Sequence, residues 1–298
     1  MTVTISRPST QCKRYKALAF GLCLFALLSC SAAQSEPTTD RIKIASFNLE
    51  VFGPTKAGNA AVLGIMGEII RQFDIVAVQE IRDASGTAVI ALKSAINSTG
   101  NHYDYEIGPR LGRTTSKEQY AFFYNTATIE ALAGAYTYDE GGTDTFEREP
   151  YVARFRVKSG NFDFALIDIH TKPEDATAEI TYLPNVISQT TAITGEPDVI
   201  CLGDFNADGS YFDEGSYLSI FPASIYDWLI PNTADTTVAS SSNTYDRMVT
   251  LHSTDEDLTG SSGVFRYDQV IDMGSTLPGD ISDHYPIWAE FWTNKDSD

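Results

Sequence analysis

Three short polar segments adjoin apolar runs in this chain and carry residue types that suit metal-assisted phosphodiester cleavage. They are Gln79-Glu80, residues 203–208 (GDFNAD) and residues 282–286 (SDHYP). Their carboxylates and amides suit a hard cation, and the imidazole of His284 can exchange a proton near neutral pH. Each neighbouring apolar run is typical of a buried strand, so a rigid core should hold these side chains at an open edge. The pattern predicts a hydrolytic enzyme.

Strands and helices are predicted to alternate along the chain, which indicates layered sheets covered by helices. Asp175 is expected to cap the third helix, and Pro184 to kink or split it. Strands are expected over residues 41–49, 75–78, 119–124, 154–158, 162–169, 199–202, 247–251 and 287–291, and helices over 59–72, 87–96 and 175–194. No linker or repeat divides this region, so we expect one catalytic domain over residues 41–298.

Residues 1–29 have the order of a secretory signal peptide, in which basic residues precede an apolar run over residues 17–28. The run is short for a membrane span. It ends in LLSC, which is similar to a bacterial lipobox, so cleavage before Cys30 would leave a cysteine for lipidation. Ordinary cleavage near residues 31–33 is an open alternative. Either route predicts export, with free secretion or a lipid anchor at the cell surface or outer membrane, and a polar linker over residues 30–40.

Composition limits how the protein can bind its substrate. With 298 residues and 43% hydrophobic content, the chain can bury a full core. Removing residues 1–29 leaves 17 basic residues against 40 acidic ones, a net charge of about −23. Such a surface repels nucleic acid at long range and argues against a broad basic patch. Beyond Cys30 only Cys201 remains, so no internal disulfide is expected and Cys201 is predicted to be a small buried hydrophobe.

Eight segments resemble deoxyribonuclease I in order and nearly in spacing, from about residue 41 to residue 291. They are IASFN (44–48), VQEIR (78–82), LGR (111–113) with KEQY (117–120), FEREP (146–150), GDFNAD (203–208), ADTT (234–237), YDR (245–247) and ISDHYP (281–286). The deoxyribonuclease I family belongs to the endonuclease/exonuclease/phosphatase superfamily. The resemblance implies an α/β fold, a four-layered α/β sandwich of two packed mixed β-sheets flanked by helices.

The resemblance also implies roles for single residues. It pairs His170 with Glu118 and His284 with Asp246, and a carboxylate on one ring nitrogen makes the other nitrogen a better proton acceptor. One histidine can then deprotonate water while the other protonates the leaving oxygen. A magnesium or manganese site is implied at Glu80, Asn48 and Asp283, while Asp204 and Asn206 would orient the attacking water or a phosphate oxygen.

Simpler explanations exist for several of these residues. Glu118 could be a solvated charge and Asp246 a turn residue, as is common in so acidic a chain. His102 and His252 lie outside every motif and are expected at the surface. Mutual consistency favours the catalytic interpretation, because two histidines each have a carboxylate partner beside a separate cluster of oxygen ligands.

Two structural calcium sites are implied as well, in loops that are rich in oxygen ligands. The alternative is that Asp and Thr simply favour turns. One site is matched by Asp235 and Thr237, and the other by Glu140, Asp144, the carbonyl of Phe146, and Glu149.

The chain departs from the family at positions that contact DNA. Ser116 stands at the position of a minor-groove tyrosine, and Glu50 at a position that is arginine in some members. Arg82 and Arg148 match arginines that contact phosphate and groove. The preference between double- and single-stranded DNA is therefore open. Gly209 and Asn243 replace one vertebrate disulfide, and a shortened loop over residues 140–143 replaces the other.

The resemblance implies an exported, monomeric endonuclease that hydrolyses DNA with a divalent metal and leaves 5′-phosphate ends. Another superfamily activity is an alternative, such as a phosphoinositide or sphingomyelin phosphodiesterase or a genotoxin subunit, because the core chemistry is shared. A non-catalytic binding module is a further alternative from another class, which the filled catalytic positions disfavour.

Overall fold

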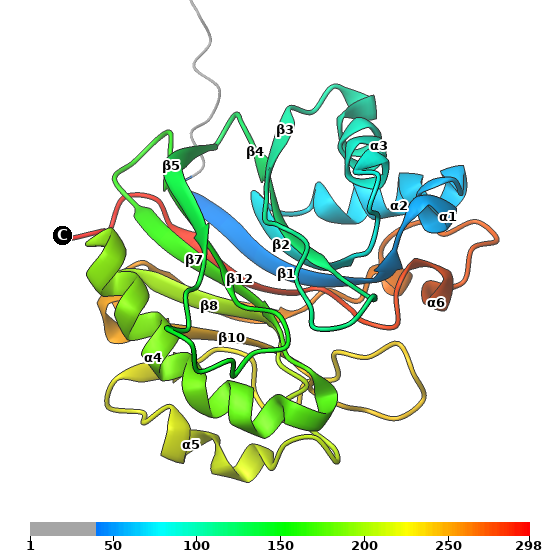
Figure 1. Cartoon of the computed structure of the whole chain (residues 1–298). Helices are drawn as coiled ribbons and strands as arrows, with labels where there is room; N and C mark the ends of the chain where they lie inside the picture. Colours follow the sequence, from blue (N-terminus) through cyan, green and yellow to red (C-terminus); the bar gives the residue numbers. More distant parts are fainter. Residues whose placement is uncertain (1–39) are drawn as a thin grey trace, which may run out of the picture. The chain divides into compact units, whose positions relative to one another are not determined.

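The computed structural model describes residues 40–298 (Figure 1). The predicted signal peptide, the Cys30 lipidation site and nearly all of the predicted linker lie outside the described residues. None of the helices within residues 40–298 is both long and apolar enough to cross a membrane.

The first sheet has six strands in the order β11-β12-β1-β2-β4-β3. Its central pair, β1 and β2, is parallel, and the other neighbouring pairs are antiparallel. The strands are β1 (Arg41–Phe52), β2 (Ile75–Ile81), β3 (Tyr103–Ile107), β4 (Gln119–Asn125), β11 (Leu258–Val264) and β12 (Ile287–Trp292).

The second sheet repeats this plan in the order β5-β6-β7-β8-β10-β9. Here β7 and β8 form the central parallel pair, and their neighbours are antiparallel. The strands are β5 (Ile129–Thr137), β6 (Tyr151–Val157), β7 (Asp163–His170), β8 (Val199–Asp204), β9 (Tyr226–Trp228) and β10 (Asp246–Leu251).

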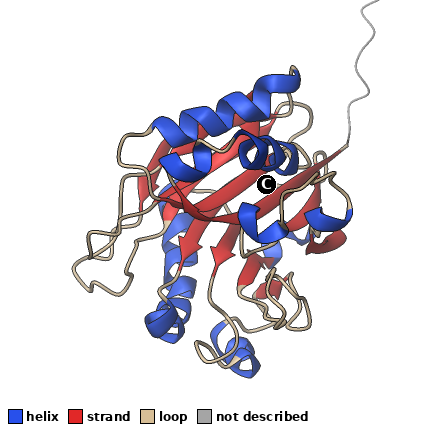
Figure 2. Cartoon of the chain, turned by 90° about the vertical axis from the view of Figure 1, so that its right-hand side faces the viewer, coloured by secondary structure: helices blue, strands red, loops and turns tan. Residues whose placement is uncertain are grey.

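Helices cover the outer faces of both sheets (Figures 1 and 2). The helices are α1 (Pro54–Ala57), α2 (Ala60–Ile70), α3 (Thr87–Ile96), α4 (Ala176–Thr194), α5 (Tyr217–Ile220) and α6 (Pro278–Ile281), with short 3-10 turns at Asn97–Thr99, Pro173–Asp175, Glu214–Ser216, His252–Glu256 and Tyr267–Gln269. Apolar side chains of α2 and α3 pack on the first sheet, and those of α4 pack on the second. The two inner faces share a third apolar core. The predicted four-layered sandwich is confirmed.

The expected strands and helices are present, but the predicted cap of α4 is wrong. Asp175 precedes α4 without capping it, because its carboxylate pairs with Lys172 at 2.8 Å. Of the two effects expected of Pro184, a split is contradicted, since α4 continues through the proline as one helix, and a kink stays a prediction. Buried Leu183 and Val186 anchor it to the second sheet on both sides of the proline, and such packing can outweigh a penalty of about 3 kcal/mol. Cys201 is fully buried, as predicted.

Gly203 brings two catalytic candidates together. Its φ is 148°, and a Cβ atom at this position would lie 1.9 Å from the carbonyl oxygen of Ile169 on the adjacent strand β7. Only glycine tolerates this approach without a shift of the backbone. The register that results pairs His170 with Asp204 at the carboxyl ends of β7 and β8.

Candidate active site

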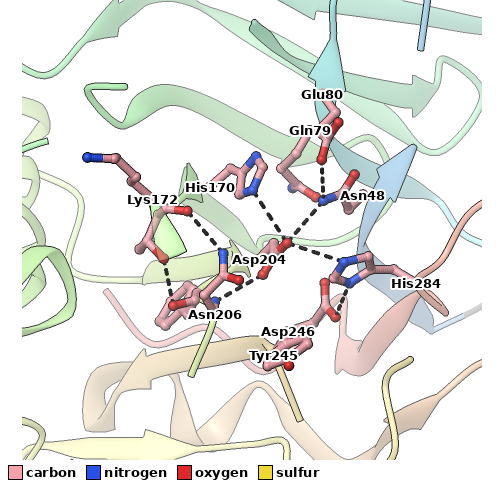
Figure 3. Close-up of polar contacts among 12 residues, drawn as sticks. Asn48, Gln79, Glu80, His170, Lys172, Asp204, Asn206, Tyr245, Asp246 and His284 are labelled. Atoms are coloured by element: carbon pink, nitrogen blue, oxygen red, sulfur yellow. Dashed lines mark hydrogen bonds and ion pairs between the residues drawn. The ribbon is translucent and has the colours of Figure 1, made fainter. Parts of the chain in front are cut away.

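The candidate site lies where the ends of both sheets meet (Figure 3). Asn48 comes from β1 and Glu80 from β2 in the first sheet, while His170 and Asp204 end strands of the second. The amide nitrogen of Asn48 donates hydrogen bonds to Asp204 Oδ2 at 3.0 Å and to Glu80 Oε1 at 3.3 Å. One amide therefore joins carboxylates that belong to different sheets.

The first carboxylate–imidazole pair links His170 of the second sheet to Glu118, which directly precedes β4 of the first. Their Nδ1 and Oε2 atoms are 2.9 Å apart. Oε1 of Glu118 accepts a hydrogen bond from Arg82 at 2.8 Å. Nε of Arg148 lies 3.5 Å from Oε2, the oxygen that faces His170. Burial raises the pKa of Glu118, but the hydrogen bond and charge of His170 and the two guanidiniums lower it more, to about 2. Glu118 is thus held as an anion.

The second pair runs in the opposite direction between the sheets. Asp246 begins β10 of the second sheet, His284 precedes β12 of the first, and Oδ2 lies 2.8 Å from Nδ1. Burial raises the pKa of Asp246. Burial would lower the pKa of His284, but Asp246 and Asp204 outweigh it and raise that pKa well above its ordinary value. Both directions mean that this pair keeps its proton to higher pH.

Asp204 lies between the two imidazoles. Its Oδ2 is 3.5 Å from Nε2 of His170 and 3.4 Å from Nε2 of His284. Burial raises the pKa of Asp204, but the charges of the two histidines outweigh burial, so the pKa lies below its ordinary value. The other Asp204 oxygen accepts the backbone N–H of Asn206, whose side-chain amide donates to the carbonyl of Thr171. The geometry thus places one anion within reach of two proton carriers.

The oxygen ligands fit a divalent cation. Asp204, Asp246 and His284 form one of the groups within residues 40–298 whose ligand atoms lie within 4.8 Å of one another. Asp246 Oδ1 is buried and has no hydrogen-bond partner among the described residues. Glu80 faces the same site through Asn48. Asp283 is 61% exposed and lies 3.8 Å from His284 Nε2, so its part in a metal site stays a prediction.

Backbone strain is concentrated at this site. Five non-glycine residues of the described chain have positive φ, and four of them surround the site: Glu50 (44°), Val51 (49°), Glu80 (62°) and Asn206 (48°). The fifth is Asp144 (52°). A β-branched residue such as Val51 is a clear outlier in this region, and each such conformation costs about 1–3 kcal/mol. Strain of this size persists where the surroundings fix the backbone, which is typical of functional sites.

Lys56 is a site residue that the sequence did not reveal. Its ammonium donates to the carbonyls of Leu49 and Glu50 at 3.0 and 2.6 Å, and to the carbonyl of Ile281 at 3.1 Å. It thereby fastens the strained Glu50–Val51 segment to the loop that carries His284. The fourth acceptor is the carboxylate of Glu50, at 3.2 Å from the ammonium. The other three are backbone carbonyls, which have no signature in the sequence.

The two arginines that were expected to contact DNA differ in exposure. The Arg82 side chain is 31% exposed and pairs with Glu80 at 2.9 Å as well as with Glu118. Arg148 is only 7% exposed, and its guanidinium donates to the carbonyls of His170 and Thr171. Arg148 therefore supports the His170 pair from inside the protein, which disfavours a direct DNA contact. Ser116 is exposed in the loop before β4.

The two loops that were expected to bind calcium differ in how their carboxylates are arranged. Glu140, Asp144 and Glu149 line one surface hollow together with Asp139, while Phe146 is buried beneath. The carboxylate of Glu140 already accepts backbone N–H groups of this loop, and Asp144 pairs with Arg113. At the other loop, Asp235 Oδ1 accepts a hydrogen bond from the Thr237 hydroxyl, and Arg266 lies 3.6 Å from Oδ2.

Most of the sequence is related to known nucleases. Residues 45–284 match the model of the endonuclease/exonuclease/phosphatase family. Deoxyribonuclease-1 of Oryctolagus cuniculus is 39% identical over 258 residues, which are 83% of this chain and 91% of that protein. The chain is a deoxyribonuclease I-like member of this superfamily. Deoxyribonuclease-1 of Bos taurus and of Homo sapiens are 37% and 36% identical over 256 residues, 83% of this chain and 90% of each relative.

Solved structures of the superfamily share the fold. An endonuclease/exonuclease/phosphatase from Bacteroides vulgatus gives a TM-score of 0.60 at 17% identity, over 84% of this chain and 98% of that one. D. rerio TDP2 complexed with a single-strand DNA product also gives 0.60, at 14% identity, over 85% of this chain and 99% of that one. At such identities the likeness concerns the fold alone.

Proposed function

We propose that this protein is an endonuclease that hydrolyses DNA phosphodiester bonds and leaves 5′-phosphate ends. The observation that carries the proposal is the convergence of two carboxylate–imidazole pairs on Asp204, at 3.5 and 3.4 Å. Hydrolysis of a phosphodiester needs a group that takes a proton from water and a group that gives one to the leaving oxygen. The relatives named deoxyribonuclease-1 support DNA as the substrate.

A catalytic Mg²⁺ or Mn²⁺ fits the oxygen ligands of Glu80 and Asn48, with Asp283 as a further candidate. When bound, such an ion neutralises charge on the phosphate as the reaction proceeds. Asp204 and Asn206 then orient the attacking water or a phosphate oxygen. These assignments rest on the contacts of Asn48 with Glu80 and Asp204, and on the hydrogen bond from the Asn206 N–H to Asp204.

The surroundings of the two histidines suggest how they divide the proton transfers. His284 faces Asp246 and Asp204, which favour its charged form, so it suits donation of a proton to the leaving 3′ oxygen. His170 shares its carboxylate with two guanidiniums and suits acceptance of a proton from water. Water then adds to phosphorus, the bond to the 3′ oxygen breaks, and the products carry a 5′ phosphate and a 3′ hydroxyl.

A plasmid-nicking assay tests the proposal. Residues 41–298, purified alongside His284→Ala by the same protocol, should convert supercoiled plasmid to open circles with magnesium or manganese, and not with EDTA. The variant controls for contaminating nuclease. Sphingomyelin and phosphoinositide hydrolysis are measured in parallel. No nicking by wild-type protein, with turnover of a lipid phosphodiester, would replace the proposed substrate while keeping the superfamily chemistry.

We further propose that the protein is exported, is freely secreted or lipid-anchored through Cys30, acts as a monomer, and binds structural Ca²⁺ at the two loops described above. Basic and apolar residues in segment 1–29 support export. Mass spectrometry of the mature N-terminus separates a lipidated Cys30 from cleavage beyond it. Asp235→Asn and Asp144→Asn should each reduce the rise in melting temperature that calcium produces by binding the folded state.

A further inference from the structure

A second group of carboxylates lies at the opposite end of the second sheet. Asp163 begins β7 and Asp198 directly precedes β8, whereas His170 and Asp204 end these strands. The six residues of β8 span roughly 20 Å, so this acidic end is well separated from the catalytic residues. Nothing in the proposed reaction uses it.

Three distant parts of the chain contribute to this acidic end. Asp198 comes from the segment before β8, Asp257 from the segment before β11, and Asp296 from the segment after β12. Each offers an oxygen within 4.8 Å of the others, and Glu196, Asp198 and Asp298 form an overlapping group of the same kind. We call these five residues the acidic cluster.

Two members of the acidic cluster, Asp198 and Asp257, each have a buried oxygen without a hydrogen-bond partner within residues 40–298, although the hydroxyls of Thr254 and Ser253 lie near enough to Asp198 to lower its pKa. Asp198 and Asp257 are each 1% exposed, and Oδ1 of each lacks a hydrogen-bond partner within residues 40–298. A buried carboxylate without a partner is strongly unfavourable. Groups of this kind are normally paired or bound to a metal.

Few positive charges are near enough to compensate. Arg154 lies 3.7 Å from Asp163 and 4.0 Å from Glu196. Within residues 40–298, no other basic side chain forms an ion pair with Asp163 or with the acidic cluster. Burial, with the neighbouring carboxylates, raises the pKa of Asp198 to about 6 and that of Asp257 to about 7. The free cluster is therefore unfavourable when fully ionised.

We propose that the acidic cluster is a Ca²⁺ site, separate from the catalytic site and from the two loops assigned above. The cluster offers carboxylates without histidine or cysteine, which favours a hard cation. Ligands from three chain segments allow the larger, adaptable shell of Ca²⁺ better than the strict octahedron of Mg²⁺. Bound calcium fastens the segment after β12 to the second sheet, where Asp296 Oδ2 already accepts the N–H of Asp163 at 3.3 Å.

Terbium luminescence tests the site directly, because Tb³⁺ replaces Ca²⁺ and emits when a nearby tryptophan is excited. Trp292 donates its backbone N–H to the carbonyl of Asp257 at 2.6 Å, so it is a local antenna. We expect tryptophan-sensitised emission that calcium displaces and that both Trp292→Phe and the double variant Asp198→Asn/Asp257→Asn reduce, whereas Asp235→Asn and Asp144→Asn leave this part of the signal in place. Emission as strong in Trp292→Phe or in the double variant as in wild type would overturn the proposal.

Thermal melting gives a second test, in which the variant is expected to be more stable than wild type when calcium is absent. Without calcium, Asp198→Asn/Asp257→Asn should melt at a higher temperature than wild type, because it removes buried negative charge. Calcium should raise the melting temperature of wild type more than that of the double variant. The matched control is Asp255→Asn, in the more exposed group Asp227, His252 and Asp255. An equal calcium response in wild type and double variant would refute the site, and Asp296→Asn repeats the test if the double variant does not fold.

Discussion

The two carboxylate–imidazole pairs look equivalent in sequence but lie in different surroundings. Glu118 has Arg82 at 2.8 Å and Arg148 at 3.5 Å in addition to His170. Asp246 has no lysine or arginine partner within residues 40–298, and its Oδ1 is unsatisfied there. One carboxylate is thus shared between an imidazole and two guanidiniums, whereas the other serves a single imidazole.

This difference sets how firmly each pair holds a proton. Burial raises the pKa of Glu118, but the hydrogen bond and charge of His170, followed by the guanidiniums of Arg148 and Arg82, lower it to about 2. Burial raises the pKa of Asp246, and Asp246 with Asp204 raises that of His284. Glu118 is therefore held as an anion, while the Asp246–His284 pair keeps its proton to higher pH, because the neighbouring charges differ. An enzyme that needs one acid and one base can use this asymmetry.

The largest expected effect is loss of either imidazole. His170→Ala and His284→Ala should each lower kcat by about 100-fold or more, the usual scale for a positioned acid or base. Initial rates of plasmid nicking measure the loss. His252→Ala is the matched control, since His252 is exposed and pairs only weakly with Asp227 at 3.6 Å. Near-normal turnover in a folded His284→Ala variant would remove the second pair from the mechanism.

Changing the carboxylates tests the asymmetry itself. Glu118→Gln leaves the buried Arg148 and the partly buried Arg82 without their shared anion, which should lower the free energy of unfolding by about 3 kcal/mol. Asp246→Asn should cost about 1 kcal/mol, because the pKa of this carboxyl shows that burial disfavours its charge. Urea unfolding of both variants measures the difference. Equal losses would mean that the arginines do not depend on Glu118.

The elements that carry the site were largely predictable from sequence. Residues 199–202 in β8 are fully buried, and such a continuous apolar run is typical of a central parallel strand. Strands β3, β5, β9 and β11 were not predicted, because most of their residues are half-exposed or exposed and Gly134 interrupts β5. Edge strands of this kind lack both the apolar run and a clear alternation.

Contacts across the two sheets could not be predicted from local patterns. The resemblance indicated which carboxylate faces each histidine, and the structure brings each pair within 3 Å. Neither the burial of Arg148 nor the positive φ of Val51 has a local signature, since both depend on segments far away in sequence. The unsatisfied oxygens of Asp198 and Asp257 likewise become visible only when three chain segments are assembled.

The pH dependence should separate the pairs further. The raised pKa of His284 means that its pairing stabilises the fold fully below the ordinary histidine pKa of about 6.5 and stops doing so as pH rises through the folded pKa. Asp246→Asn lowers that folded pKa, so the alkaline limb of the kcat/KM profile should move to lower pH. Glu118→Gln should leave this limb in place. A shift of the same limb in both variants would contradict distinct roles for the two pairs.

The smallest expected effect concerns Arg82, which contacts Glu118 of the first pair and not Asp246 of the second. If Arg82 contacts a DNA phosphate, Arg82→Gln should reduce the slope of log affinity against log salt by about 0.9 on duplex DNA. If it only holds Glu118 in place, kcat should fall while the slope stays the same. Rates measured across a range of sodium chloride concentrations distinguish these outcomes, because phosphate contacts release counterions and internal ion pairs do not.

Arg266→Gln is the matched control on the side of the His284 pair. Arg266 is 37% exposed, close to the 31% of Arg82, and lies 3.6 Å from Asp235. An equal change of slope in both variants would indicate a general effect of net charge on this acidic surface. A change in Arg82→Gln alone would place DNA on the side of the site where Glu118 and its arginines lie. The asymmetry between the pairs would then extend from proton transfer to substrate binding.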